Sequence, residues 1–192
     1  MSRDSADGRR RPHLVVAVAV GVVLLLVAAL LVRHHVAQPF RVPSASMAPL
    51  LEPGDVLLAD RSTRGTAQRG DVVVFDGRGY FAPSEGDGER YWVKRVIAVG
   101  GDRVECCDAD GMITLDGAAL AEPYLPAGTA PSEIEFDLLV PEGRIFVLGD
   151  NRTDSTDSRH LLGAPGGGMI PVDRVVGEAE RIVWPLTRGG AL

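Results

Sequence analysis

The stretch YWVKRVIAVGGDRVEC, residues 91–106, holds the pattern that decides the fold. Aromatic and β-branched residues dominate 91–99, Gly-Gly-Asp follows at 100–102, and a second short apolar run begins at Arg103. Aromatic and β-branched residues favour strands, whereas adjacent glycines mark turns. The stretch therefore predicts two consecutive strands joined by a turn.

The same pattern continues through most of the 192-residue chain. Many short strands separated by glycine and proline turns are typical of a β-sandwich or barrel. The expected strands are Asp55–Ala59, Asp71–Phe75, Tyr91–Val99, Arg103–Cys106, Met112–Leu115, Arg144–Leu148 and Arg174–Trp184. Asp116-Gly117 favours a hairpin turn. We predict a mostly β fold with an antiparallel β-sheet core, in which residues 103–141 or so form a small inserted β subdomain.

One long apolar run precedes this β region. Leu14–Val32 is an unbroken run without a charged residue. As a helix it would span roughly 28 Å at about 1.5 Å per residue, close to the ~30 Å hydrocarbon core of a bilayer. A buried core helix would show a polar face, and a cleavable signal peptide has a shorter apolar stretch. We therefore expect one N-terminal transmembrane helix at 14–32.

The charges that flank this run predict its orientation. Arg9, Arg10 and Arg11 precede it, whereas Arg33 alone follows it closely. Positive charge is retained on the cytoplasmic side of a membrane helix. The expectation is a single-pass protein of the cell membrane with a cytoplasmic N-terminus (1–13) and an extracytoplasmic domain (33–192).

Composition excludes several classes of function. The net charge is −6, and no basic stripe is present, which argues against nucleic-acid binding. The sequence has no CxxC or HExxH pattern, so we expect neither a metal site nor a cofactor. Cys106 and Cys107 are adjacent, which leaves an incidental pair, a disulfide between neighbours and a bond to another chain as alternatives.

Lys94 is the one lysine among twenty basic residues, the others being arginines. Arginine cannot be deprotonated under ordinary conditions, whereas a desolvated lysine can be neutral near pH 7 and act as a base. A lone lysine in a strand is also commonly a solvent-facing residue. Composition alone therefore leaves an exposed cation and a general base as two interpretations.

Two further segments carry polar groups in unusual density. Ser44 and Ser46 lie between Pro43 and Pro49, and proline stiffens a loop in the way that a nucleophile needs, although such a segment can also be a plain linker. Residues 149–159, GDNRTDSTDSR, invite a calcium-loop interpretation, but the EF-hand positions that require Asp, Gly and Glu hold other residues. We expect the arginines of this segment, Arg152 and Arg159, to pair with its own carboxylates, Asp150, Asp154 or Asp157, and so to stiffen a turn.

Taken together, these segments resemble the sequence boxes of type I signal peptidases, which are serine peptidases of the Ser/Lys class. The matching boxes are Ser44–Pro49, Gly70–Phe75, Lys94–Val96 with Gly100–Asp102, and Gly149–Arg159. They occur in the family's order behind a suitable anchor. Leu50 stands where the family commonly carries Thr, and the glycine run Gly163–Gly168 replaces a shorter connection.

The resemblance implies a role for each matched residue. Ser46 would be the nucleophile and Lys94 the general base, with Ser44 in the oxyanion hole and Ser155 orienting the lysine. A structural turn would contain Asp150, Arg152, Asp157 and Arg159. Small apolar pockets that accept Ala-x-Ala ends of signal peptides would be lined by Phe40, Val42, Pro43, Met47 and Val93.

The partners implied are signal peptides of secreted preproteins and membrane lipid, for a protein that is monomeric in the membrane. Two other interpretations remain. A Ser/His/Asp hydrolase would have to use His160, beside Asp157 and Ser158, because the other histidines flank the apolar run. A membrane-tethered β module that binds a partner would explain the anchor and the strands, but not the ordered boxes.

Overall fold

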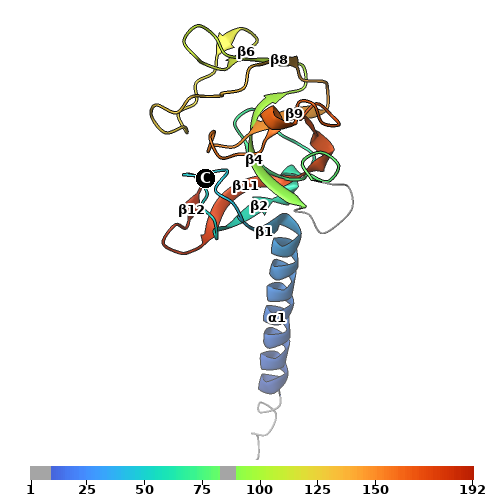
Figure 1. Cartoon of the computed structure of the whole chain (residues 1–192). Helices are drawn as coiled ribbons and strands as arrows, with labels where there is room; N and C mark the ends of the chain where they lie inside the picture. The colour runs from blue at the N-terminus through green and yellow to red at the C-terminus, as the bar shows by residue number, and fades with distance from the viewer. Residues whose placement is uncertain (1–9, 83–89) are drawn as a thin grey trace, which may run out of the picture. The chain divides into compact units, whose positions relative to one another are not determined.

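A computed structural model describes residues 10–82 and 90–192 of the chain (Figure 1). The chain divides into two units, Met1–Ala37 and Gln38–Leu192. Helix α1 (Arg10–Val36) makes up the described part of the first unit. The apolar side chains from Leu14 to Val27 on this helix are exposed. Among the residues that the structure describes, no helix is long and apolar enough to cross a membrane, so the anchor at 14–32 stays a prediction.

The second unit is built on a large sheet of eight strands. Its order is β1-β2-β11-β3-β4-β9-β10, with β12 beside β11, and the pairings from β2 to β10 are antiparallel. The strands are β1 (Ala37–Arg41), β2 (Val56–Asp60), β3 (Val72–Asp76), β4 (Tyr91–Val99), β9 (Arg144–Leu148), β10 (Ile170–Pro171), β11 (Val175–Trp184) and β12 (Gly190–Ala191). The stretch at 91–99 is thus an internal strand, between β3 and β9.

A second, four-stranded antiparallel sheet has the order β7-β6-β5-β8. Its strands are β5 (Arg103–Cys106), β6 (Thr114–Leu115), β7 (Ala118–Ala119) and β8 (Phe136–Leu139). Between β6 and β7, Asp116 and Gly117 have φ angles of 52° and 79°, as a two-residue hairpin turn of type I′ requires. The predicted hairpin is therefore confirmed.

The two sheets share a hydrophobic core, and Figure 1 shows β6 and β8 on the side of β9 that is away from β2. Ile97 and Phe146 of the large sheet pack with Val104 and Phe136 of the small one. The ring centroids of Phe136 and Phe146 are 5.2 Å apart. Burial of these side chains fixes the small sheet against β4 and β9, the strands that carry the lysine and lead into the 149–159 turn.

The mostly β, antiparallel fold is confirmed, with differences in detail. The expected strand Met112–Leu115 is reduced to Thr114–Leu115, and β1, β8, β10 and β12 were not expected. Within residues 10–82 and 90–192, three short 3-10 helices connect strands: η1 (Arg61–Thr63), η2 (Ser158–Leu161) and η3 (Val172–Arg174). Cys106 and Cys107 form a disulfide between neighbours, one of the alternatives that the sequence left open. The expected domain boundaries stay predictions.

Candidate active site

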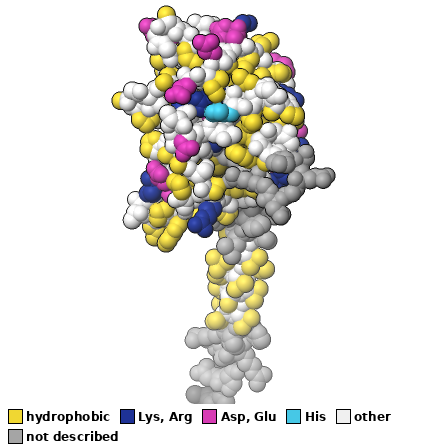
Figure 2. Space-filling model, viewed as in Figure 1, with side chains coloured by type: hydrophobic (Ala, Val, Ile, Leu, Met, Phe, Trp, Pro, Cys, Tyr) yellow, Lys and Arg dark blue, Asp and Glu magenta, His cyan; other side chains and the backbone are white. Residues whose placement is uncertain are grey.

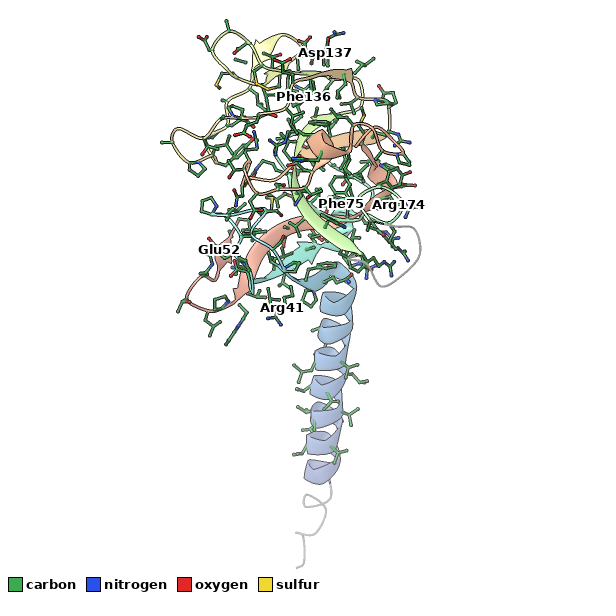
Figure 3. All side chains as sticks on the ribbon, viewed as in Figure 1. Arg41, Glu52, Phe75, Phe136, Asp137 and Arg174 are labelled. Atoms are coloured by element: carbon green, nitrogen blue, oxygen red, sulfur yellow. A yellow bond between two sulfur atoms is a disulfide. The ribbon has the colours of Figure 1, made fainter. Side chains whose placement is uncertain are left out.

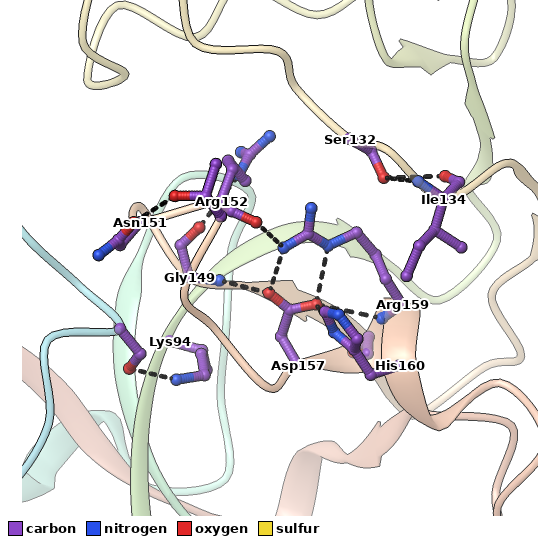
Figure 4. Close-up of polar contacts among 12 residues, drawn as sticks. Lys94, Ser132, Ile134, Gly149, Asn151, Arg152, Asp157, Arg159 and His160 are labelled. Carbon is purple, nitrogen blue, oxygen red and sulfur yellow. Dashed lines mark hydrogen bonds and ion pairs between the residues drawn. The ribbon is translucent and has the colours of Figure 1, made fainter.

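The fold brings Ser46 and Lys94 into contact, although 48 positions separate them in the sequence. Lys94 Nζ donates a hydrogen bond to Ser46 Oγ at 2.6 Å (Figure 4). Lys94 of the internal strand β4 is 2% exposed. Its Nζ lies 5.6 Å from the centroid of the Trp92 ring. The lysine is therefore buried against the loop between β1 and β2 that contains Ser46, and it does not face solvent.

Ser46 lies in the loop that connects β1 to β2, and that loop is held by its backbone. Asn151 N donates to the Ser46 carbonyl at 3.1 Å, and Asn151 Nδ2 donates to the Ala45 carbonyl at 3.1 Å. Within the loop, Ala48 N donates to Ala45 O at 2.9 Å. These bonds fix the backbone around Ser46 and leave its hydroxyl on the side of Lys94.

Gly149 explains how the 149–159 turn can approach Ser46 so closely. A Cβ at position 149 would lie 2.4 Å from the Ser46 carbonyl oxygen and 2.2 Å from Ser155 Oγ. Real side chains do not reach such distances, so glycine is needed here for close packing. Ser155 Oγ is itself buried. Its predicted contact with the lysine stays a prediction.

Ser44 lies beside the hydroxyl group of Ser46. Ser44 Oγ donates to Ser46 Oγ at 3.4 Å, which is long for a bond between two hydroxyls. Ser44 is exposed, whereas Met47 one position after Ser46 is 1% exposed. Ser44 therefore lies on the solvent-facing side of Ser46, and its predicted place in an oxyanion hole stays a prediction.

Buried ion pairs hold the 149–159 turn (Figure 4). Arg159 Nη2 lies 2.8 Å from Asp157 Oδ2, and both side chains are almost fully buried. Asp157 Oδ2 also accepts a hydrogen bond from Gly149 N at 3.1 Å, and Arg152 Nε donates to Gly149 O at 3.0 Å. Burial alone would raise the pKa of Asp157, but the hydrogen bond and charge of Arg159 outweigh it and hold that pKa below its ordinary value.

Two other pairs reach outside the turn, and the sequence did not indicate them. Asp150 pairs with Arg95 of β4 at 2.6 Å, and Arg152 pairs with Glu122 in a bidentate contact. The expected pairing of Arg159 with Asp157 is present, but pairing of Arg152 within the turn is wrong. Glu122 lies between β7 and β8, so the connection that crosses the small sheet also holds the turn.

A cleft of about 400 Å³, counted with its open mouth, lies beside Ser46 and Lys94. All five residues expected to line the substrate pockets line this cleft. The full lining is Phe40, Arg41, Val42, Pro43, Ser44, Ser46, Met47, Val74, Tyr91, Trp92, Val93 and Lys94. Tyr91 was missed as a lining residue. Its alternation with the predicted Val93 along β4 is the signal that could have found it.

The histidine alternative finds little support in the geometry. His160 Nδ1 lies 3.6 Å from Asp157 Oδ1, but that carboxylate is already bound to Arg159. Ser158 is 0% exposed, and its Oγ accepts a hydrogen bond from Val147 N, so no substrate can reach it. Within the described residues, no group of three or more His, Cys, Asp or Glu side chains could hold a metal ion.

A family model and curated relatives that match this chain describe signal peptidases. The family model described as signal peptidase, peptidase S26, matches residues 15–184. Signal peptidase I of Mycobacterium tuberculosis strain H37Rv is 35% identical over 222 residues, covering 91% of this chain and 74% of that protein. Signal peptidase I T of Bacillus subtilis is 32% identical over 174 residues, covering 85% and 82%. A crystal structure of a signal peptidase I from Enterococcus faecalis V583 aligns with a TM-score of 0.44 and 29% identity, over 59% of this chain and 96% of that one.

Proposed function

The chain belongs to the signal peptidase family, peptidase S26, and we propose that it uses Ser46 as nucleophile and Lys94 as general base to remove signal peptides from exported preproteins. The observation that carries the proposal is the 2.6 Å hydrogen bond between Lys94 Nζ and Ser46 Oγ. Burial favours the neutral amine of a lysine, which can then accept the serine proton along the same line.

The mechanism is acyl transfer in two steps. Ser46 Oγ attacks the scissile carbonyl carbon while Lys94 takes the hydroxyl proton, and the lysine then returns that proton to the leaving amine. Water, deprotonated by the same lysine, then attacks the acyl carbon, and the lysine returns the proton to Ser46 Oγ as the ester bond breaks. The Ser44 hydroxyl and the Ser46 N–H are proposed to stabilise the oxyanion, each such donor being worth about 3–4 kcal/mol. The 3.4 Å approach of Ser44 Oγ to Ser46 Oγ supports this placement. Ser155 is proposed to orient the lysine.

Specificity for Ala-x-Ala ends is proposed to come from the cleft. Phe40, Val42 and Met47 are buried apolar residues of its wall, and Pro43 and Val93 complete that wall. Tight apolar walls favour small side chains, because larger ones would have to displace packed atoms. Signal peptides of preproteins are therefore the proposed partners.

Membrane anchoring is part of the proposal. The run Leu14–Val32 falls within α1, and the cluster at Arg9–Arg11 would keep the N-terminus in the cytoplasm. We propose a single-pass monomer with lipid around 14–32 and an extracytoplasmic peptidase domain at 33–192. The separate four-stranded sheet supports an inserted subdomain at about 103–141 within that domain.

The test is cleavage of a model preprotein in detergent by the full chain and three variants. Ser46→Ala and Lys94→Arg should each lower kcat/KM by at least about 10³-fold, since a dyad acts as a unit. Ser62→Ala, an exposed serine of η1 outside the cleft, is the matched control and should cleave normally. Near-normal cleavage by Lys94→Arg would show that the lysine is not the base, because arginine keeps the charge but cannot give up its proton.

A further inference from the structure

A second cavity, of about 680 Å³ with its open mouth, lies where β2 and β3 end and β4 and β11 begin. Because neighbouring strands are antiparallel, these four termini lie at one end of the large sheet. Four arginines line it, and we call it the arginine cavity. They are Arg61, Arg64, Arg90 and Arg174. Figure 3 labels Arg174 beside Phe75, the register partner of Val175.

The carboxylates in the arginine cavity do not balance these four cations. Asp76 and Asp173 are the acidic residues that line it. Asp76 pairs with Arg78 at 2.8 Å and with Arg90 at 3.0 Å, and the Arg78 hydrogen bond above all holds the pKa of Asp76 below its ordinary value. Asp76 is thus fully engaged with two arginines. Among the described residues that line the cavity, a local excess of positive charge remains, in a chain whose net charge is −6 and whose charges are otherwise interspersed over the face seen in Figure 2.

The pairing of Arg61 within the protein is incomplete. Its Nε is buried and has no hydrogen-bond partner among the described residues. Buried polar groups in folded proteins are almost always paired, and a buried guanidinium donor needs an acceptor more than most. Arg61 and Arg174 lie on η1 and η3, and both line this cavity.

Phosphate oxygens are the acceptors that such a set of arginines fits. The guanidinium is a planar fork that binds phosphate through two parallel hydrogen bonds. Gln38 and Tyr91 also line the arginine cavity and add neutral donors and acceptors of the kind that bind hydroxyl or glycerol groups. A phosphodiester with a polar head matches this combination better than a carboxylate does.

The position of Gln38 in the chain favours a lipid headgroup over a free phosphate ion as the ligand. Gln38 follows Val32, the last residue of the apolar run, by six positions. We propose that the arginine cavity binds the phosphate of an anionic phospholipid headgroup. This inference rests on the proposed membrane anchor, since the anchor is what would bring the domain to a lipid surface. Tyr91 lines both this cavity and the active-site cleft, so a bound headgroup would sit one side chain away from the substrate.

The test measures binding by titration calorimetry, with the full chain in micelles of a neutral detergent. Short-chain phosphatidylglycerol should bind saturably, and Arg61→Gln or Arg174→Gln should each weaken binding about tenfold, as the loss of one charge-assisted hydrogen bond predicts. Arg61→Lys keeps the charge without the fork and should bind with intermediate affinity. Arg181→Gln is the matched control, because Arg181 is an exposed arginine of β11 that does not line the cavity. Its binding should equal that of the wild type.

Three results would overturn the proposal. Equal binding of phosphatidylcholine would mean that headgroup charge is not recognised. Equal binding of inorganic phosphate would assign the cavity to a free phosphate ion. Equal weakening by Arg181→Gln would reduce the effect to net charge. The readout is independent of cleavage, so an inactive Ser46→Ala variant should still bind lipid, and alkaline extraction of membranes tests the anchor separately.

Discussion

The 149–159 turn and the small sheet both contain ion pairs between arginine and aspartate, but the pairs differ in how far they are exposed to solvent. Asp157 and Arg159 have side chains that are 0% and 2% exposed, whereas Arg103 and Asp137 are both 53% exposed. Water solvates the exposed pair whether or not it forms, but the buried pair has lost its water and depends on its partner. Charge density in a sequence therefore says little about stability until burial is known.

The difference has a functional consequence in this fold. Through Asp157 and Arg152, the buried pairs hold Gly149. Two residues after Gly149, Asn151 donates hydrogen bonds to the backbone carbonyls of Ser46 and Ala45. The exposed pairs join Arg103 of β5 to Glu105 on the same strand and to Asp137 of β8. Similar charged residues thus build a rigid support in one region and a solvated surface in the other.

The largest effect is expected from Asp157→Asn. This change leaves the Arg159 guanidinium buried without a counter-charge, and loss of one partner of a buried pair typically costs about 3–5 kcal/mol. Chemical denaturation of the full chain in detergent should show a matching fall in the free energy of unfolding. An unchanged free energy would mean that the buried pair contributes no more than a surface pair.

The contribution of the Asp157–Arg159 pair to stability should also depend on pH. The pKa of Asp157 is lower in the folded chain than in the unfolded one, so its stabilising contribution is complete above the ordinary aspartate pKa and is lost as pH falls through the folded value. The wild type should therefore lose stability below about pH 4. Asp157→Asn should lose less stability over that range, because it no longer has the carboxylate that becomes protonated.

A smaller and more local effect is expected from Gly149→Ala. The added methyl group would meet the Ser46 carbonyl oxygen and Ser155 Oγ at impossible distances, so the nucleophile loop must shift. A misplacement of about 1 Å at a reacting group can cost roughly 10²-fold in rate, so kcat should fall by about that factor while the chain stays folded. Gly163→Ala is the control, since a Cβ there has open space around it. Equal kcat in both variants would mean that the turn does not position Ser46.

Local patterns in the sequence were enough to predict much of this arrangement. The strand at 91–99 is apolar and β-branched along its length, and the boxes around Ser46 and Lys94 have fixed internal spacing, so neither needs information from distant residues. The contact between Ser46 and Lys94, in contrast, could not be predicted from local patterns. It arises from the pairing of β4 with its neighbours and from the loop after β1, and it follows from the family resemblance, not from spacing.

Long-range pairs could not be predicted in the same way. Arg152 lies thirty positions from Glu122, and that glutamate stands in an irregular segment with no periodic signal. From the sequence alone, we expected Arg152 to pair with the nearer carboxylates of its own turn. Burial decides against them, because Asp157 is taken by Arg159 and Asp150 by Arg95. The strand β8 was missed for a similar reason, since Phe136 faces the core only when paired with β5.

The smallest effect is expected from Asp137→Asn on the small sheet. Asp137 lies 2.5 Å from Arg103 but directly opposite Glu105 across β5 and β8, so losing the ion pair also relieves a repulsion between like charges. The unfolding midpoint should match the wild type at low salt and at about 0.5 M salt, where the Debye length is only about 4 Å. The deficit of Asp157→Asn should persist at that salt concentration, because buried charges are poorly screened. A salt-dependent loss in Asp137→Asn as large as that of Asp157→Asn would remove the distinction between the two regions.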